Sequence, residues 1–429
     1  MFKRIPPDKQ TPPQIGNSTL ITIERHYRLI TPLMGGGVKA GENDPSFLIR
    51  PSSIRGQLRF WWRACFGGSN QPQSNEALLA DMFKREAAIF GQAADSQSSG
   101  ASAIQVEVEV TNIGSPFRAT TNRGQEVRIS AMNSPYGYAA FPLQDKPNAS
   151  VREGIEFRLT LRLKHAEQRD QIEKVLWAWQ TFGGIGARTR RGFGVLQALD
   201  KAAENLAFNT RAQLANHIEK IIDDRIHWPN DVPHLAPNMQ LRLLNISQNP
   251  LTIWANLLDR YKKFRQQRNE GNQPNRPGRS RWPEPDALRR LTRQRSRLHE
   301  RPISELDAFP RGEFGLPIIF HFKDSDDPVD SELRLQADPI ASQQKGDRFA
   351  SPMLLKPVAS NGQLFGLIAV LEGSSLNGRQ AIIKNRRINT APVAIHLPPE
   401  QINTIVDKNR RPLLTNQSVI TSFLATIEE

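Results

Sequence analysis

Three segments in the first half of the chain alternate apolar and polar residues, which is the pattern of half-buried β-strands. They are ITIERHYRL (21–29), IQVEVEV (104–110) and IEFRLTLRL (155–163). In the third segment, Phe157, Leu159 and Leu161 point to the same side because side chains alternate across a strand. We therefore expect three strands, each with one face against a hydrophobic core.

A helix is predicted between the first two strands, in the segment RPSSIRGQLRFWWRACFGG (50–68). Pro51 with a serine cap marks its start, and paired glycines mark its end. At about 100° per residue, the apolar side chains fall on one arc: Ile54, Leu58, Trp61, Trp62 and Cys65. Arg55, Arg59 and Arg63 fall on the adjacent arc. The helix should have an apolar side that buries both tryptophans and a side that carries arginines.

Helical spacing returns in RDQIEKVLWAWQTF (169–182), and FGVLQAL (193–199) predicts a short last strand. The resulting order, strand, helix, strand, strand, helix, strand, is that of a ferredoxin-like (RRM-like, βαββαβ) unit of the α+β class. The join between the second and third strands, roughly residues 111–150, is too long for a hairpin turn. We expect MNSPYGYAAFPL (132–143) to form an inserted finger there.

The second half has a mixed pattern after a linker near residues 200–210. Helices are expected in TRAQLANHIEKIIDD (210–224), PLTIWANLLDRYKKF (250–264) and DALRRLTRQRSRL (286–298). Strands are expected in MQLRLLNIS (239–247), LPIIFHF (316–322), PMLLKPV (352–358) and LFGLIAVL (364–371). These elements predict a second α+β domain without fixing its topology. The predicted domains are 1–200 and 211–429, the second with a basic helical insertion at about 255–301.

The net charge of the chain indicates which class of molecule it binds. The 429 residues carry 57 Lys and Arg against 43 Asp and Glu, a net charge of +14, which favours a polyanion. Residues Arg260 to Arg301 alone hold twelve arginines and two lysines against four acids. Nucleic acid is the first expectation and a membrane surface the second. No apolar run is long enough to cross a bilayer, and we expect a cytoplasmic protein.

The segment TFGGIGARTRRGFG (181–194) packs five glycines and three arginines into fourteen residues. Glycine lets backbone N–H groups approach a ligand, and arginine offers a planar fork of donors to phosphate. A helix precedes this loop and a strand follows it, the reverse of the order in mononucleotide sites. The loop is therefore predicted to cradle a nucleic-acid backbone. The alternative is a tight connection with solvated arginines.

Catalytic patterns are missing from the sequence. The single cysteine, Cys65, excludes an internal disulfide and any multi-cysteine zinc site. The histidines form no zinc-protease pattern, and His217, His227 and His234 are too loosely spaced for a metal site. Asp44 is the one acid worth testing for cleavage chemistry, although its loop position is more typical of a turn residue. We expect no catalytic residue, metal or cofactor.

Five motifs in order resemble the first RAMP-superfamily subunit of the Cmr module, the type III-B CRISPR effector complex. They are ITPLMGGG (30–37), IRPSSIRGQLRFWWR (49–63), GGIGARTRRGFG (183–194), SRWPEPDALRRLT (280–292) and RFASPMLLKP (348–357). The resemblance spans residues from about 20 to 357. It implies two ferredoxin-like domains in tandem, the second with insertions, in a non-catalytic subunit. The implied partners are CRISPR guide RNA, target RNA and the other subunits, which carry the nuclease activity.

The resemblance also implies an RNA-binding set. Its members are Arg50, Arg55, Arg59, Arg63, Gly183, Gly184, Gly186, Arg188, Arg190, Arg191, Gly192, Gly194, Arg281 and Trp282. Trp282 has a second interpretation, as the anchor of a loop on its domain. The glycines of GGGVKAGENDP (35–45) could serve the guide, the target or a neighbouring subunit. The alternative function is a stand-alone guide-processing endoribonuclease. Such an enzyme usually shows a histidine near the glycine loop, and none lies between His165 and His217.

Overall fold

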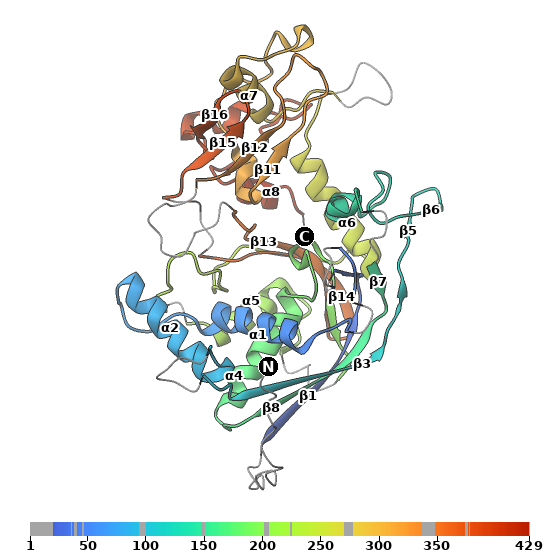
Figure 1. Ribbon diagram of the computed structural model, residues 1–429, viewed down its shortest axis with the longest axis vertical. Helices are drawn as coiled ribbons and strands as arrows, with labels where there is room; N and C mark the ends of the chain where they lie inside the picture. The colour runs from blue at the N-terminus through green and yellow to red at the C-terminus, as the bar shows by residue number, and fades with distance from the viewer. Residues whose placement is uncertain are drawn as a thin grey trace, which may run out of the picture.

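The computed structural model places both halves of the chain in one α+β molecule with several antiparallel sheets (Figure 1). It describes residues 20–35, 37, 41–44, 47–93, 100–146, 151–200, 206–223, 225–269, 278–336, 348–373, 376 and 378–428. Among these residues no helix is both long and apolar enough to cross a membrane.

The first sheet contains the three strands that the alternation predicts. It consists of β3 (Ile104–Asn112), β8 (Glu156–Leu163), β1 (Ile21–Leu29) and β9 (Leu196–Ala198), in that order and antiparallel throughout. In order along the chain these are strands two, three, one and four, so the first strand lies inside the sheet and pairs with the last strand, β9, at one edge. Tyr27 of β1 lies under Trp179 with ring centroids 5.5 Å apart, which fixes the helical layer on this face.

The long helices of this half are α1 (Pro51–Phe66), α2 (Asn75–Phe90) and α4 (Gln168–Phe182). The predicted helix α1 is confirmed, and Trp61 and Trp62 are buried in the core as its apolar arc requires. The sequence analysis missed α2. Ser74 gave a signal for it, because its side chain caps the helix by accepting from the N–H of Ala77.

The long join between β3 and β8 folds into small elements. They are β4 (Ser115–Pro116), β5 (Ala119–Thr120), β6 (Glu126–Val127), α3 (Gly137–Ala140), η1 (Phe141–Leu143) and β7 (Val151–Glu153), with β7 paired to β2 (Leu33–Met34). The β5–β6 hairpin extends to one side of the molecule (Figure 1). The remainder packs on the second half, where Tyr136 stacks on Trp254 at 4.5 Å. Residues 147–150 lie outside the described residues.

The second half begins with α5 (Arg211–Ile221) and a three-stranded sheet ordered β10 (Leu241–Leu244), β14 (Gln363–Val370), β13 (Met353–Ser360). Helix α6 (Pro250–Arg265) follows β10. A complete ferredoxin-like unit has four strands, and the described residues add no fourth strand to this sheet. The tandem pair of ferredoxin-like units therefore stays a prediction.

A separate module lies between α6 and β13 in sequence and continues after β14. Its sheet runs β11 (Ile318–Phe320), β12 (Ser331–Leu335), β15 (Ala381–Asn385), β16 (Asn389–Val393). Around it lie α7 (Glu284–Thr292), η4 (Arg297–His299), η5 (Pro310–Phe314), η6 (Pro399–Thr404) and α8 (Val419–Ala425). Helix α7 is shorter than predicted because Arg293 takes a left-handed conformation that ends it. The module stands at one end of the molecule (Figure 1).

One hydrophobic cluster joins the two halves. It includes Trp61 and Trp179 from the first half, Leu214 from α5, and Leu354 and Leu367 from the second sheet. Because the halves share a core, the glycine loop after α4 lies between two packed layers. The predicted domain boundaries at 200 and 211 stay a prediction, and residues 201–205 of the linker lie outside the described residues.

Candidate nucleic-acid interface

The glycine loop passes over bulky side chains at close range. A Cβ on Gly183 would lie 2.5 Å from Trp61 Nε1, and one on Gly192 would lie 2.5 Å from Trp254 Nε1. Gly192 also has a φ of +84°, a conformation that side chains other than glycine rarely adopt. Trp254 Nε1 donates to the carbonyl of Arg191 at 2.7 Å. Glycine is therefore needed at these positions for packing, independently of any ligand.

Arginines of the loop attach it to the second half. Arg191 donates to Met353 O at 2.9 Å and lies over the Tyr261 ring at 4.8 Å. Arg190 donates to the carbonyl of Ser351. These bonds tie the loop to the segment RFASPMLLKP, far away in sequence. Arg191 therefore holds the loop to the second half, and it is also a predicted phosphate-binding residue.

Lys356 of β13 hydrogen-bonds to the start of the glycine loop. Its ammonium donates to Gly183 O at 2.7 Å and to Gln180 O at 3.0 Å, which satisfies carbonyls at the end of α4. The side chain is fully buried, and this burial lowers the pKa of Lys356 to about 7. A buried cation holds the helix end to the second sheet.

Three other motif segments contact this loop, the second of them through Phe60, whose ring lies 5.7 Å from the guanidinium carbon of Arg190. The first motif runs beside it, since Ala187 N donates to Met34 O at 2.8 Å and Gly194 N donates to Pro32 O at 2.9 Å. Asp44, shortly after that motif, forms an ion pair with Arg50 at the start of α1. The glycine loop and these motifs, together with the segment that starts at Arg348, therefore lie side by side in the fold. Their separation along the sequence does not indicate this.

Positive charge is uncompensated at the surface of this region. Among the described residues, Arg188 and Arg190 have no carboxylate within ion-pair distance; Arg188 instead lies 4.8 Å over the exposed ring of Phe141. Burial, followed by the nearby charge of Arg191, lowers the pKa of both guanidinium groups to about 10. An anion such as phosphate would relieve this repulsion.

The amino end of α1 carries the partial positive charge of a helix start, and its first turn holds no acid. Its N–H groups are mostly occupied, because Pro51 has none and those of Ser53 and Ile54 donate to Arg50 O. The side chain of Arg50 is paired with Asp44, and its role in RNA binding stays a prediction. We call Gly186, Arg188 and Arg190 the arginine surface.

The other predicted arginines of α1 have internal partners. Glu86 of α2 is only 3% exposed, and it accepts from Arg59 Nε at 2.5 Å and from Arg63 Nη1 at 2.9 Å. Arg55 donates to Ser102 Oγ at 2.7 Å and to the carbonyl of Phe90. The arginine side of the helix is thus largely occupied by α2 and the segment after it. A role of these three residues in RNA binding stays a prediction.

Arg281 and Trp282 lie apart from the arginine surface. Trp282 is 1% exposed, and its Nε1 donates to Phe264 O at 3.2 Å. Arg281 donates to Asp407 O at 2.8 Å. A buried indole cannot stack on a base, so this geometry favours the alternative interpretation of Trp282 as a loop anchor. Nearby arginines of the basic segment also have partners, such as Arg289 with Asp286 at 2.8 Å.

Candidate acids and histidines do not form an evident catalytic group. Asp44 accepts from Phe47 N at 3.0 Å besides its ion pair, as a turn residue does. In the described residues, one cluster could hold a metal ion: His299, Asp324 and Asp327. Both oxygens of Asp327 already accept from Arg289, at 2.9 and 2.8 Å. That guanidinium neutralises the carboxylate on which a metal ion would depend.

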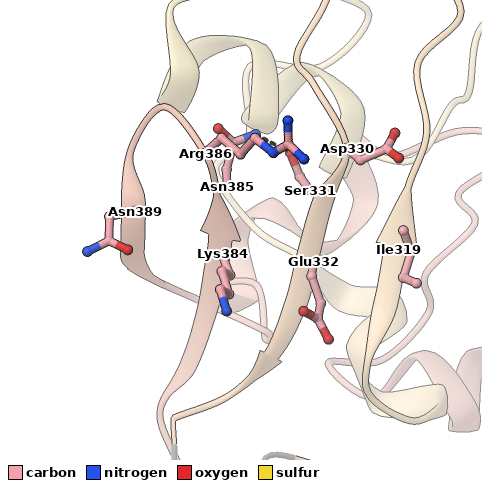
Figure 2. Close-up of a pocket in the computed structure, with 8 residues that line it drawn as sticks. All are labelled: Ile319, Asp330, Ser331, Glu332, Lys384, Asn385, Arg386 and Asn389. Carbon is pink, nitrogen blue, oxygen red and sulfur yellow. Dashed lines mark hydrogen bonds between the residues drawn. The ribbon is translucent and has the colours of Figure 1, made fainter.

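A cavity of about 510 Å³ lies on the outer face of the module sheet. Figure 2 shows its lining on neighbouring strands, with Glu332 on β12 and Lys384 on β15. Asn385 Nδ2 donates to Ser331 Oγ at 2.6 Å at one end. None of the predicted binding residues lines this cavity. It is distinct from the arginine surface.

The sequence of the first half matches a known family model. Residues 26–197 match the model of the RAMP superfamily, beginning inside β1 and ending inside β9. We call these residues the RAMP domain, after the model that they match. The RAMP domain thus includes most of the first sheet, the helices α1, α2 and α4 and the inserted elements. It contributes every residue of the arginine surface.

Solved structures show a looser likeness. The apo form of Cmr1 from Pyrococcus furiosus is 17% identical, with a TM-score of 0.47, covering 87% of this chain and 94% of that chain. A chain of the type III-B Cmr-beta complex bound to cognate target RNA is 14% identical, with a TM-score of 0.43, covering 88% of this chain and 96% of that chain. No curated protein matches the sequence.

Sequence analysis missed several residues around the RAMP domain's glycine loop. Phe141 belongs to the inserted segment, and Lys146 lies beside the turn at Gly41. Lys356 belongs to the fifth motif, RFASPMLLKP, but an apolar strand pattern does not show whether a lysine within it is buried or exposed. Glu86 could have been found through the helix cap at Ser74.

Proposed function

We propose that this chain is a non-catalytic RNA-binding subunit of a type III-B CRISPR (Cmr) effector complex, in contact with guide RNA, target RNA or both. The RAMP domain and the ordered series of five motifs support the proposal. The net charge of +14 supports a polyanionic partner. The second sheet, β10-β14-β13, is interpreted as part of a second ferredoxin-like unit into which the module is inserted.

The observation that carries the proposal is the convergence of the motifs at the arginine surface. Exposed Gly186 presents its backbone, and half-buried Arg188 and Arg190 present guanidinium groups that have no carboxylate partner among the described residues. Phosphate groups bind to such an arrangement. Contacts to phosphate carry no base code, so binding should depend little on sequence.

Arg188→Ala is the variant that tests the surface. Arg188 holds no hydrogen bond to the second half among the described residues, so its removal should leave the fold intact. We expect affinity of the full chain for single-stranded RNA to fall about tenfold, the usual loss for one charged hydrogen bond. The slope of log affinity against log salt should shrink by roughly 0.7. Filter binding or anisotropy at several salt concentrations measures both.

Arg169→Ala is the matched control, because Arg169 is exposed in the first turn of α4, at the end opposite to the glycine loop. It removes the same charge and should leave affinity and slope unchanged. A flat salt response of the wild-type chain, or equal losses in the two variants, would contradict the proposal. Co-expression with the other Cmr subunits, followed by sequencing of the RNA that co-purifies, tests membership of the complex.

A further inference from the structure

A second cavity adjoins the arginine surface, between α1, α2 and the segment 231–233. Its volume is about 410 Å³, within the range of about 300 to 1,000 Å³ that is usual for small-molecule sites. The lining consists of Phe60, Arg63, Met82, Phe83, Glu86, Asp231, Val232 and Pro233. The two helices of this cavity lie side by side in Figure 1.

The cavity has aromatic walls. Phe60 of α1 is half-buried, and Phe83 of α2 is 53% exposed. Met82 is buried beside them. A phenyl ring left half in water gains from a flat apolar partner, and nucleobases stack on such rings irrespective of their identity.

The rim of the cavity is polar and carries both signs of charge. Asp231 supplies a carboxylate, which repels phosphate but can accept hydrogen bonds from base N–H groups, whereas Glu86 already accepts from Arg59 and Arg63. Arg63 bonds to other described residues from Nη1 alone, toward Glu86. Its other N–H groups can donate to base carbonyl or ring nitrogen acceptors. The rim suits the edge of a base and disfavours a phosphate.

Phe60 links this cavity to the arginine surface. The Arg190 guanidinium carbon lies 5.7 Å from the centre of the Phe60 ring, and the same ring lines the cavity. A base is separated from its phosphate by one ribose, so a phosphate on Arg190 brings its own base to the aromatic walls. We propose that the cavity binds one unpaired nucleobase of the RNA whose phosphate lies on Arg190, stacked on Phe60 and Phe83. This inference rests on the proposed function.

The test uses the full chain and a short single-stranded RNA that carries fluorescent 2-aminopurine in place of adenine. Phe83→Ala should lower affinity at least about fivefold, since one stacked base contributes about that much or more, and should abolish part of the fluorescence quenching. The salt slope should not change, because no phosphate contact is lost. On the same RNA with abasic positions, wild type and Phe83→Ala should bind equally.

Leu79→Ala is the matched control. Leu79 lies one turn earlier on α2, is 37% exposed and does not line the cavity, so its variant should bind like wild type. If wild type fails to bind RNA at all, the proposed function falls and the cavity proposal with it. If wild type binds with a steep salt response but Phe83→Ala matches it on base-containing RNA, the cavity proposal alone is overturned. If both variants still bind RNA but no longer associate with the other subunits, this face is a protein-docking surface and the cavity proposal is also overturned.

Discussion

Lys356 binds the carboxyl end of α4 through two hydrogen bonds. Its ammonium is buried between two carbonyls and has no carboxylate partner among the described residues, so the protein pays for its charge in desolvation. Arg191 plays a related part, because its bonds to Met353 O and Phe314 O hold the loop to the second half. Replacing all three loop arginines would therefore disturb folding, whereas Arg188 can be changed alone.

Lys356 makes stability depend on pH. Its folded pKa, about 7, lies below the ordinary lysine value of 10.5, so between these values the unfolded chain binds the extra proton. Stability from this residue therefore rises with pH above 7, by up to about 1.4 kcal/mol per pH unit. Denaturation at pH 7, 8 and 9 should show this rise in wild type and a flatter profile in Lys356→Met. Lys384→Met, at an exposed lysine, should retain the wild-type profile; identical profiles in all three would contradict the assignment.

At the scale of elements, the glycine loop is a joint between two packed layers. Its helix α4 belongs to the first half, and its η2 turn (Thr189–Arg191) packs on β13 of the second. Left-handed residues at Arg188, Gly192 and Gly194 reverse the chain sharply enough to do this. The same turn leaves Gly186 and Ala187 exposed, next to the first motif. The residues of the loop that pack on the second half, such as Gly192, therefore differ from Gly186 and Arg188, which are proposed to bind RNA.

Gly192→Ala should destabilise the protein more than Gly154→Ala. Both glycines have positive φ, +84° and +68°, and that conformation costs other residues roughly 1–2 kcal/mol. A Cβ at Gly154 meets nothing within 4 Å, whereas one at Gly192 would lie 2.5 Å from Trp254 Nε1. Overpacking should add about 1–3 kcal/mol at Gly192. Urea unfolding of both variants measures the difference. Equal losses would mean that Trp254 is free to move away and that the joint is loose.

At the scale of the whole molecule, the hydrophobic core is shared by both halves, whereas the uncompensated positive charge lies in one place. The shared hydrophobic cluster makes the two halves one packed body. Much of the basic segment in α6 and α7 is held by internal acids such as Asp286 and Asp307. The uncompensated charge instead gathers where the RAMP domain meets β13. A long RNA strand bound there would contact both halves.

The whole chain is expected to bind RNA without cutting it. Asp44 is engaged by Arg50 and the N–H of Phe47, and the carboxylate of Asp327 is engaged by Arg289, so neither is arranged to activate water or hold a catalytic metal ion. Incubation of labelled guide and target RNA with the chain, with and without Mg²⁺, Mn²⁺ or Zn²⁺, should give no products. Cleavage abolished by Asp44→Ala would establish the alternative endoribonuclease function.

The sequence alone determined the local elements whose periodicity is strong. The three long strands and helix α1 with both buried tryptophans follow from side-chain periodicity, which acts over neighbouring residues. The position of the glycine-rich basic loop can likewise be read from the sequence. Helix α2 and the short strands β12, β15 and β16 were missed. Their segments are short, or their patterns are broken by charged residues such as Arg85 and Arg334.

Only the tertiary structure decided what each arginine does. Arg55, Arg59, Arg188 and Arg191 look alike in sequence. In the structure, Arg55 donates to Ser102 and Arg59 to Glu86, Arg188 lies over the Phe141 ring, and Arg191 joins the two halves. These partners come from segments far away along the chain. The free energy of a charged group depends on its burial and on the charges placed beside it, and both are set by packing rather than by sequence neighbours.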